Sequence, residues 1–90
     1  MNAGKSDPPY RSRMARFFFH VRDSEHVEDT DGLLLFDMEQ ARREAVRGAR
    51  SLVSESVLAG RLNLEGRIDV EDEVGLLLFS VSYRYAVGLA

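Results

Sequence analysis

The sequence predicts an α+β domain of two layers, in which a four-stranded, mainly antiparallel sheet carries one long helix on one face. Residues 37–60 repeat their apolar positions with the period of a helix, and they are the only segment that does so clearly. The segments on either side alternate apolar and polar residues, as half-buried strands do. The predicted order is therefore β-β-α-β-β, with two hairpins flanking one helix.

The ends of the central helix are marked by residues with a clear physical preference. Asp37 is a good N-cap, and Gln40 three residues later completes a capping-box pattern. Gly60 is a natural residue just past the end, because glycine enters the left-handed conformation without a Cβ penalty. The inward face is narrow, since it is lined by small residues: Ala41, Ala45 and Ala49. Such a face predicts close docking on a sheet that supplies the bulky side chains.

Four segments are predicted to form the sheet. The first strand covers residues 16–23, and an acidic connector leads to a short second strand at 32–36. After the helix, residues 61–66 are expected to form a loop in which Leu62 and Leu64 cover the helix end. A clean alternation then predicts a strand at 67–71, a turn at 72–75 and a last strand at 76–85.

The alternation also assigns residues to the two faces of the sheet. In the first strand, Phe17, Phe19 and Val21 are expected to face the helix. The opposite face is then expected to expose Phe18, Leu76 and Leu78. This is more apolar surface than a soluble monomer usually leaves exposed to water. We therefore predict a homodimer that associates through these three residues, or by pairing an exposed edge strand.

The domain boundaries follow from composition. Residues 1–14 are expected to be a basic, disordered tail, residues 15–86 the single domain and residues 87–90 the C-terminal end. The chain has no cysteine, no run long enough to span a membrane and no signal-peptide pattern, so a cytoplasmic protein is expected. The net charge of −3 argues against a protein built to coat nucleic acid.

The first strand and the turns resemble a known family. Residues 16–23 read RFFFHVRD, and they are followed by the acidic turn 29–32, the helix and a second acidic turn at 72–75. This pattern resembles a family of short bacterial proteins of unknown function whose first strand has the motif R-[YF]-F-F-H-[VL]-R-D. The resemblance covers roughly residues 14–83 and departs from the family at Ser24 and Val74. It implies a shared fold and no particular activity.

His20 is the most tempting single candidate for chemistry. It lies on the outer face of the first strand, and a histidine there could act as an acid or base near neutral pH. Asp69 or Glu71 could orient it only if the first and third strands are neighbours. A structural histidine that forms hydrogen bonds across the strands is the favoured interpretation.

Two charged groups have alternative interpretations. His26 with the surrounding carboxylates could suggest a metal site, but the spacing fits no calcium loop, and no metal is expected. Arg43, Arg47 and Arg50 form a stripe on the helix that could contact phosphates. A solvated helix face is the ordinary explanation of such a stripe.

The sequence carries no nucleophile motif, phosphate loop or dinucleotide fingerprint, so no catalytic site and no cofactor are expected. The leading hypothesis is a small, non-enzymatic interaction module, homodimeric and open to a protein partner. The alternative is a nucleic-acid-binding or antitoxin-like regulatory module that uses the arginine stripe and the basic tail.

Overall fold

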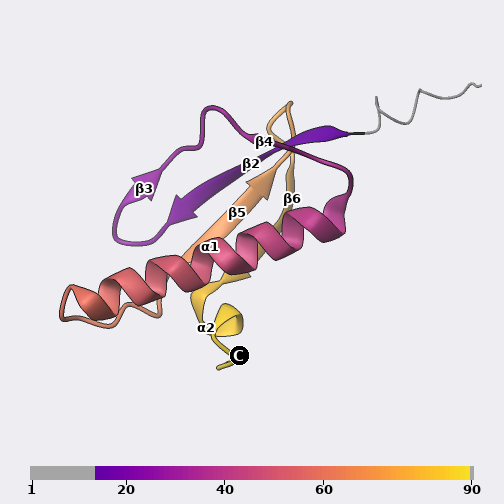
Figure 1. Cartoon of the computed structure of the whole chain (residues 1–90). Coiled ribbons are helices and arrows are strands. Elements are labelled where there is room, and N and C mark those ends of the chain that lie inside the picture. Colours follow the sequence, from indigo (N-terminus) through magenta and orange to yellow (C-terminus); the bar gives the residue numbers. More distant parts are fainter. Residues whose placement is uncertain (1–13, 90) are drawn as a thin grey trace, which may run out of the picture.

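A long helix lies across one face of an antiparallel sheet in the computed structural model, which describes residues 14–89 (Figure 1). The α+β class and the two-layer arrangement predicted from the sequence are confirmed. The predictions for the basic tail concern residues 1–13, which lie outside the described residues. The elements in chain order are β2 (Ala15–Arg22), β3 (His26–Val27), β4 (Leu33–Leu35), α1 (Met38–Leu58), β5 (Arg67–Glu71), β6 (Leu77–Ser82) and α2 (Tyr83–Ala86).

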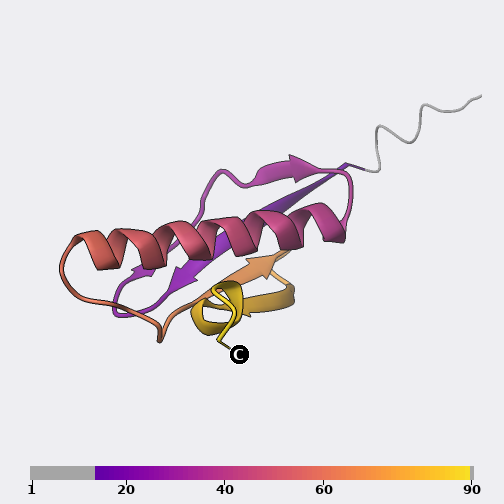
Figure 2. The same cartoon turned by 60° about the horizontal axis from the view of Figure 1, so that its bottom comes forward.

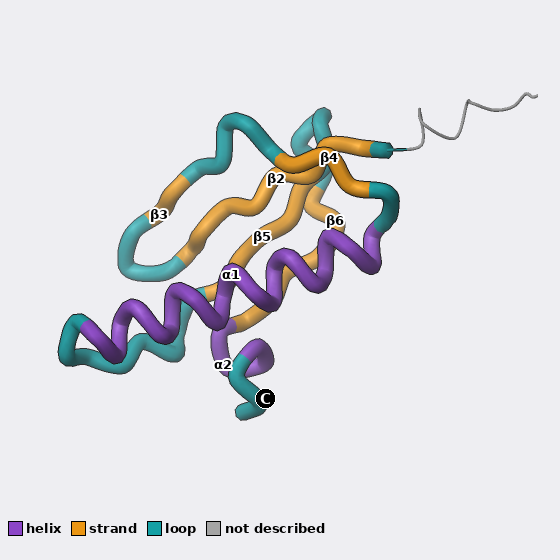
Figure 3. The backbone as a smooth tube through the Cα atoms, viewed as in Figure 1, coloured by secondary structure: helices purple, strands orange, loops and turns teal. Residues whose placement is uncertain are grey.

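The sheet has the order β3-β2-β5-β6, and every pairing in it is antiparallel. The strand β4 pairs with the first half of β2, whereas β3 pairs with its last two residues. Both short strands therefore lie along the same side of β2, with a loop between them (Figure 3). The predicted second strand at 32–36 is β4, and part of the acidic connector forms the additional strand β3, so the sheet has five strands where four are predicted.

The helix α1 begins and ends where the sequence predicts. Asp37 accepts a hydrogen bond from the Gln40 N–H at 2.9 Å, and the Gln40 side chain accepts one from the Phe36 N–H at 2.9 Å. At the other end Gly60 has a φ of 91° and its N–H donates to the Val57 carbonyl at 2.9 Å. These bonds satisfy backbone groups that a helix terminus otherwise leaves without partners.

The core is formed where α1 lies on the sheet (Figure 2). Ala41, Ala45 and Ala49 have no exposed surface, as their spacing predicts. Gly48 allows the helix to approach closely, because a Cβ there would lie 3.2 Å from the Ile68 side chain. The remaining buried apolar residues are Phe17, Val53, Ile68, Val70, Val81, Tyr83 and Ala86, with Phe19 packed against them.

The prediction that the last strand reaches Tyr85 is wrong, because β6 ends at Ser82. The Ser82 side chain accepts a hydrogen bond from the Tyr85 N–H at 3.0 Å and so starts the short helix α2. Tyr83 is fully buried, and its hydroxyl donates to Asp23 at 2.9 Å. This local N-cap overrides the alternating pattern of the preceding strand.

Two further apolar residues differ from expectation. Leu78 does not lie simply on the uncovered face, because the β5–β6 ladder contains a register shift next to it and its side chain packs against the core. Leu62 does not cover the helix end, since it is 60% exposed; Leu64 does pack against the core.

A larger side chain on the alanine face should separate helix and sheet. Ala45→Leu is expected to lower the free energy of unfolding by about 1–3 kcal/mol, because the surrounding core has no space for three more carbons. The control Ser54→Leu adds a larger side chain at an exposed position of the same helix and should change stability by less than about 0.5 kcal/mol. Urea denaturation followed by circular dichroism measures both; equal effects would contradict close docking.

Candidate functional site

The face of the sheet that α1 does not cover carries a polar cluster. The strand register places His20 beside Asp69, and Asp69 beside Ser80. His20 and Asp69 are only 6% and 8% exposed, although no helix covers them. The centre of this face is therefore held together by polar contacts, in contrast to the apolar surface that the sequence predicts there.

His20 joins three segments of the chain. Its Nδ1 accepts a hydrogen bond from the Asp29 N–H at 3.1 Å, and its Nε2 lies 3.2 Å from a carboxylate oxygen of Glu71. With Nδ1 as acceptor, the proton of the neutral ring is on Nε2, and this N–H donates a hydrogen bond to the Glu71 carboxylate. Glu28 also approaches Nδ1, at 3.1 Å. The carboxylate partner considered from the sequence is thus present, and both ring nitrogens are engaged in contacts within the chain.

Asp69 is the most heavily bonded carboxylate of the cluster. It accepts hydrogen bonds from the Arg67 side chain at 2.8 Å and from the Ser80 hydroxyl at 2.6 Å, and Arg22 lies 3.7 Å away. Burial by itself would raise the pKa of Asp69, but these donors and cations together hold it below its ordinary value. Asp69 therefore links β5 to Arg22 on β2 and to Ser80 on β6.

A second carboxylate, Asp29, fastens the loop between β3 and β4. We call residues 28–32 the arch. Asp29 accepts a hydrogen bond from the Phe19 N–H of β2 at 3.0 Å, and others from the Asp31 and Gly32 N–H groups at 3.1 and 3.0 Å. Burial would raise the pKa of Asp29, but the three N–H groups lower it below its ordinary value. The arch therefore takes the place of regular pairing with β2 over the interval between β3 and β4.

In the acidic segment near His26, Glu28 forms an ion pair with Arg22 of β2. Arg22 donates to Glu28 at 2.7 Å, and this hydrogen bond lowers the pKa of Glu28. Within residues 14–89, no three acidic or histidine side chains are grouped so that they could hold a metal ion.

The arginine stripe lies on the outside of α1, and each arginine has a partner. Arg43 lies 3.5 Å from Glu39, and Arg47 pairs with Glu44, three residues earlier in the helix. The Nε of Arg50 donates to the Ala86 carbonyl at 2.6 Å and so ties α1 to α2. The role of these residues in binding stays a prediction.

The residues predicted to form an association surface are exposed to different degrees. Phe18 is half-buried, Leu76 is 60% exposed and Leu78 contributes to packing of the core. Leu76 therefore offers the most surface to a partner.

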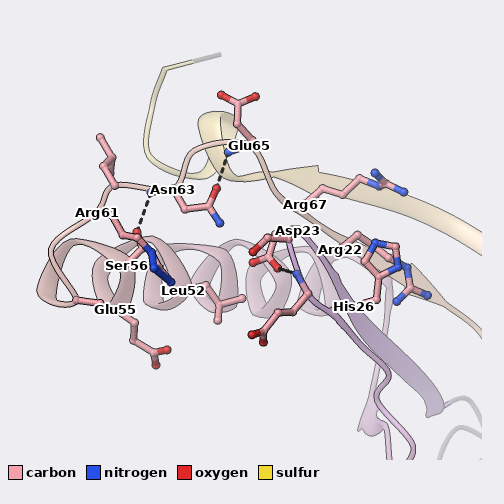
Figure 4. A pocket seen from close by; sticks show the side chains of 14 residues that line it. Arg22, Asp23, His26, Leu52, Glu55, Ser56, Arg61, Asn63, Glu65 and Arg67 are labelled. Atoms are coloured by element: carbon pink, nitrogen blue, oxygen red, sulfur yellow. Dashed lines mark hydrogen bonds between the residues drawn. The ribbon is translucent and has the colours of Figure 1, made fainter.

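A large open groove lies between the C-terminal half of α1 and the turn after β2, and no sequence pattern predicts it. Its volume is about 900 Å³, and it is bordered by side chains of both charges (Figure 4). His20 does not border it. The lining residues are Arg22, Asp23, Ser24, Glu25, His26, Leu52, Glu55, Ser56, Ala59, Arg61, Leu62, Asn63, Glu65 and Arg67.

The fold and the polar sheet face define a small α+β domain without a recognisable catalytic motif. The chain belongs to the family described as Domain of unknown function (DUF6894), whose model matches residues 16–84. No curated protein and no solved structure matches the chain. Within the described residues, neither helix combines the length and apolar character needed to cross a bilayer. The cytoplasmic location stays a prediction.

The arch makes stability depend on pH. Since the pKa of Asp29 is lowered on folding, its contribution is complete above its ordinary value of 3.8 and is lost as the pH falls through the folded-state pKa. Asp29→Asn should therefore lower the free energy of unfolding at pH 7 by about 1–3 kcal/mol. It should also reduce the dependence of that free energy on pH below about pH 5. Urea denaturation at several pH values measures this.

The matched control for this prediction is Asp31→Asn, which removes an exposed carboxylate from the same arch. It should leave both the stability and the pH dependence close to those of the unchanged protein. If the two variants behave alike, the arch does not depend on Asp29.

Proposed function

We propose that this domain is a non-enzymatic interaction module that forms a homodimer by pairing two β6 strands, one from each copy, into a continuous antiparallel sheet. The observation that carries the proposal is the open outer edge of β6. Among residues 14–89, no strand pairs with that side of β6. Its sequence, LLFSVS, contains no charged residue and no proline. Charges and prolines are two of the usual means of preventing association at an edge. The register shift at Leu78 limits regular pairing to residues 79–82.

The two edges of the sheet differ in a way that favours this choice. On the opposite edge, β3 has two residues and β4 has three, and the arch separates them. Asp29 already uses the Phe19 N–H within that arch, at 3.0 Å. A partner strand would therefore find only short, interrupted pairing there. The strand β6 has six residues, of which residues 79–82 follow the register shift without a break.

The backbone of β6 presents free hydrogen-bonding groups at defined positions. The Tyr83 N–H donates to the Gly66 carbonyl at 3.0 Å, and Val81 lies opposite Ile68. In an antiparallel ladder, alternate residues direct both backbone groups toward the same neighbour. The N–H and C=O groups of Ser80 and the N–H of Ser82 therefore point outward, where a second strand can accept and donate. The Ser82 carbonyl, as that of an N-cap residue, belongs to α2.

Apolar side chains at the beginning of β6 support the same surface. Val74, Leu76 and Leu77 are 87%, 60% and 52% exposed. Burial of apolar surface contributes about 25 cal/mol per Å², so covering these side chains favours association. Leu76 is the member of the predicted association surface that takes part in this interface.

The contacts of His20 support a module without catalysis. Its two ring nitrogens have partners at 3.1 and 3.2 Å within the chain, and the ring is 6% exposed. A general base needs a ring nitrogen within reach of a substrate.

Proline at an outward-facing position should prevent dimer formation without disturbing the β5–β6 ladder. Ser82 has a φ of −78°, which proline adopts readily. We expect the unchanged protein to have twice the chain mass of 10.2 kDa by light scattering at micromolar concentration, and Ser82→Pro to have the mass of one chain. The proline removes an outward N–H and places a ring at the interface.

The control is Ser82→Ala, which removes the same N-cap of α2 but keeps the backbone N–H. It should remain dimeric. A monomeric unchanged protein, or a dimer that persists in Ser82→Pro, would contradict pairing through β6.

A further inference from the structure

A basic depression lies along the outer side of α1, close to α2. Its volume is about 430 Å³. Four of the side chains that border it are arginines, and only one is apolar. The lining residues are Glu39, Arg42, Arg43, Val46, Arg47 and Arg50.

The helix α2 positions two of the four guanidinium groups. Arg42 donates to the Tyr85 hydroxyl at 2.8 Å, and its guanidinium carbon lies 5.5 Å from the centre of the Tyr85 ring. Arg50 donates through Nε to the Ala86 carbonyl at 2.6 Å. Each guanidinium has five N–H donors, so both keep further donors for a ligand. Orienting these side chains in advance reduces the entropy lost on binding.

The glutamate partners of Arg43 and Arg47 leave these two arginines accessible to a ligand. The Arg43 and Arg47 side chains are 70% and 71% exposed. Ion pairs in such exposed positions contribute between zero and about 1 kcal/mol. A phosphate group, which accepts bidentate hydrogen bonds from arginine, can therefore replace Glu39 or Glu44 as the partner.

An aromatic ring completes the surface. Tyr85 is 46% exposed, and the guanidinium of Arg42 lies over one face of its ring. Proteins that bind single-stranded nucleic acid combine a positive surface, which follows the phosphates, with aromatic rings on which bases stack. An acidic peptide would use the same charges but has no bases for the ring, and the centre of a protein–protein interface is usually apolar.

We propose that the depression and Tyr85 together bind single-stranded nucleic acid. Arg43, Arg47 and Arg50 contact successive phosphates, and Tyr85 stacks on a base. The three arginines span about 10 Å along the helix axis at 1.5 Å per residue, which is enough for two or three phosphates. The surface does not use the outward groups of β6, so this proposal is independent of the dimer.

In the proposed complex, the positive charge available to a nucleic acid is confined to the arginine surface of α1. The acidic arch lies at the β3 edge of the sheet, whereas α2 packs beside α1 and β6. Because the whole chain has a net charge of −3, the attraction depends on the arginine surface alone. Binding should therefore be strongest at low ionic strength and decrease steeply with salt.

The proposal is tested by fluorescence anisotropy of a labelled oligothymidylate strand with the full chain at low salt. The unchanged protein should bind it, with an affinity that decreases as salt is added. Arg47→Glu should weaken binding at least tenfold and reduce the slope of log K against log salt by about 0.7. Arg61→Glu makes the same change of charge outside the depression and should leave binding within about twofold of the unchanged protein.

Tyrosine variants separate stacking from simple attraction of charges. Tyr85→Leu removes the ring and should weaken binding about tenfold, whereas Tyr85→Phe keeps the ring and should retain most of it. Circular dichroism confirms that each variant is folded. Three results would overturn the proposal: no binding at low salt, equal losses in Arg47→Glu and Arg61→Glu, or competition by polyglutamate at the same concentration as by unlabelled oligothymidylate.

Discussion

Close docking of α1 on the sheet is the contact on which the rest of the structure depends. Ala41, Ala45 and Ala49 are fully buried, and the absence of a side chain at Gly48 leaves room for Ile68. A domain of this size has only a thin core, so the apolar area buried at this one contact dominates its stability. Because the helix covers only one face, the polar and apolar groups of the opposite face and of the two sheet edges must be satisfied by other contacts.

The uncovered face is stabilised by hydrogen bonds and charge, and one edge is closed by the arch. His20 connects β2 to β5 and to the arch through contacts of 3.2 and 3.1 Å. Asp29 connects the arch to β2 from the other direction. Buried polar groups are favourable only when they have partners, and this cluster provides them. Among the described residues, the edge that remains unpaired is the outer side of β6.

The features predicted correctly from the sequence depend on neighbours in the chain. The Asp37 cap and the Gly60 stop are such local features, and so is the alanine face of α1. The features that were missed depend on contacts between distant segments or on a competition between two local preferences. The arch needs Asp29 to reach the Phe19 N–H. The contact between His20 and Glu71 was an open possibility in the sequence, because it requires β2 and β5 to be neighbours, as the structure shows them to be. At Ser82 a helix cap prevailed over the strand pattern.

The central claim is that the smooth face of α1 lies against β5. Nuclear Overhauser effects between methyl groups test it most directly in the unmodified chain. The account predicts cross-peaks from the Ala45 and Ala49 methyl groups to those of Ile68 and Val70, since all four residues belong to one buried cluster. If the alanine methyl groups show cross-peaks only to protons within α1, the helix does not lie on this sheet, and the account is contradicted.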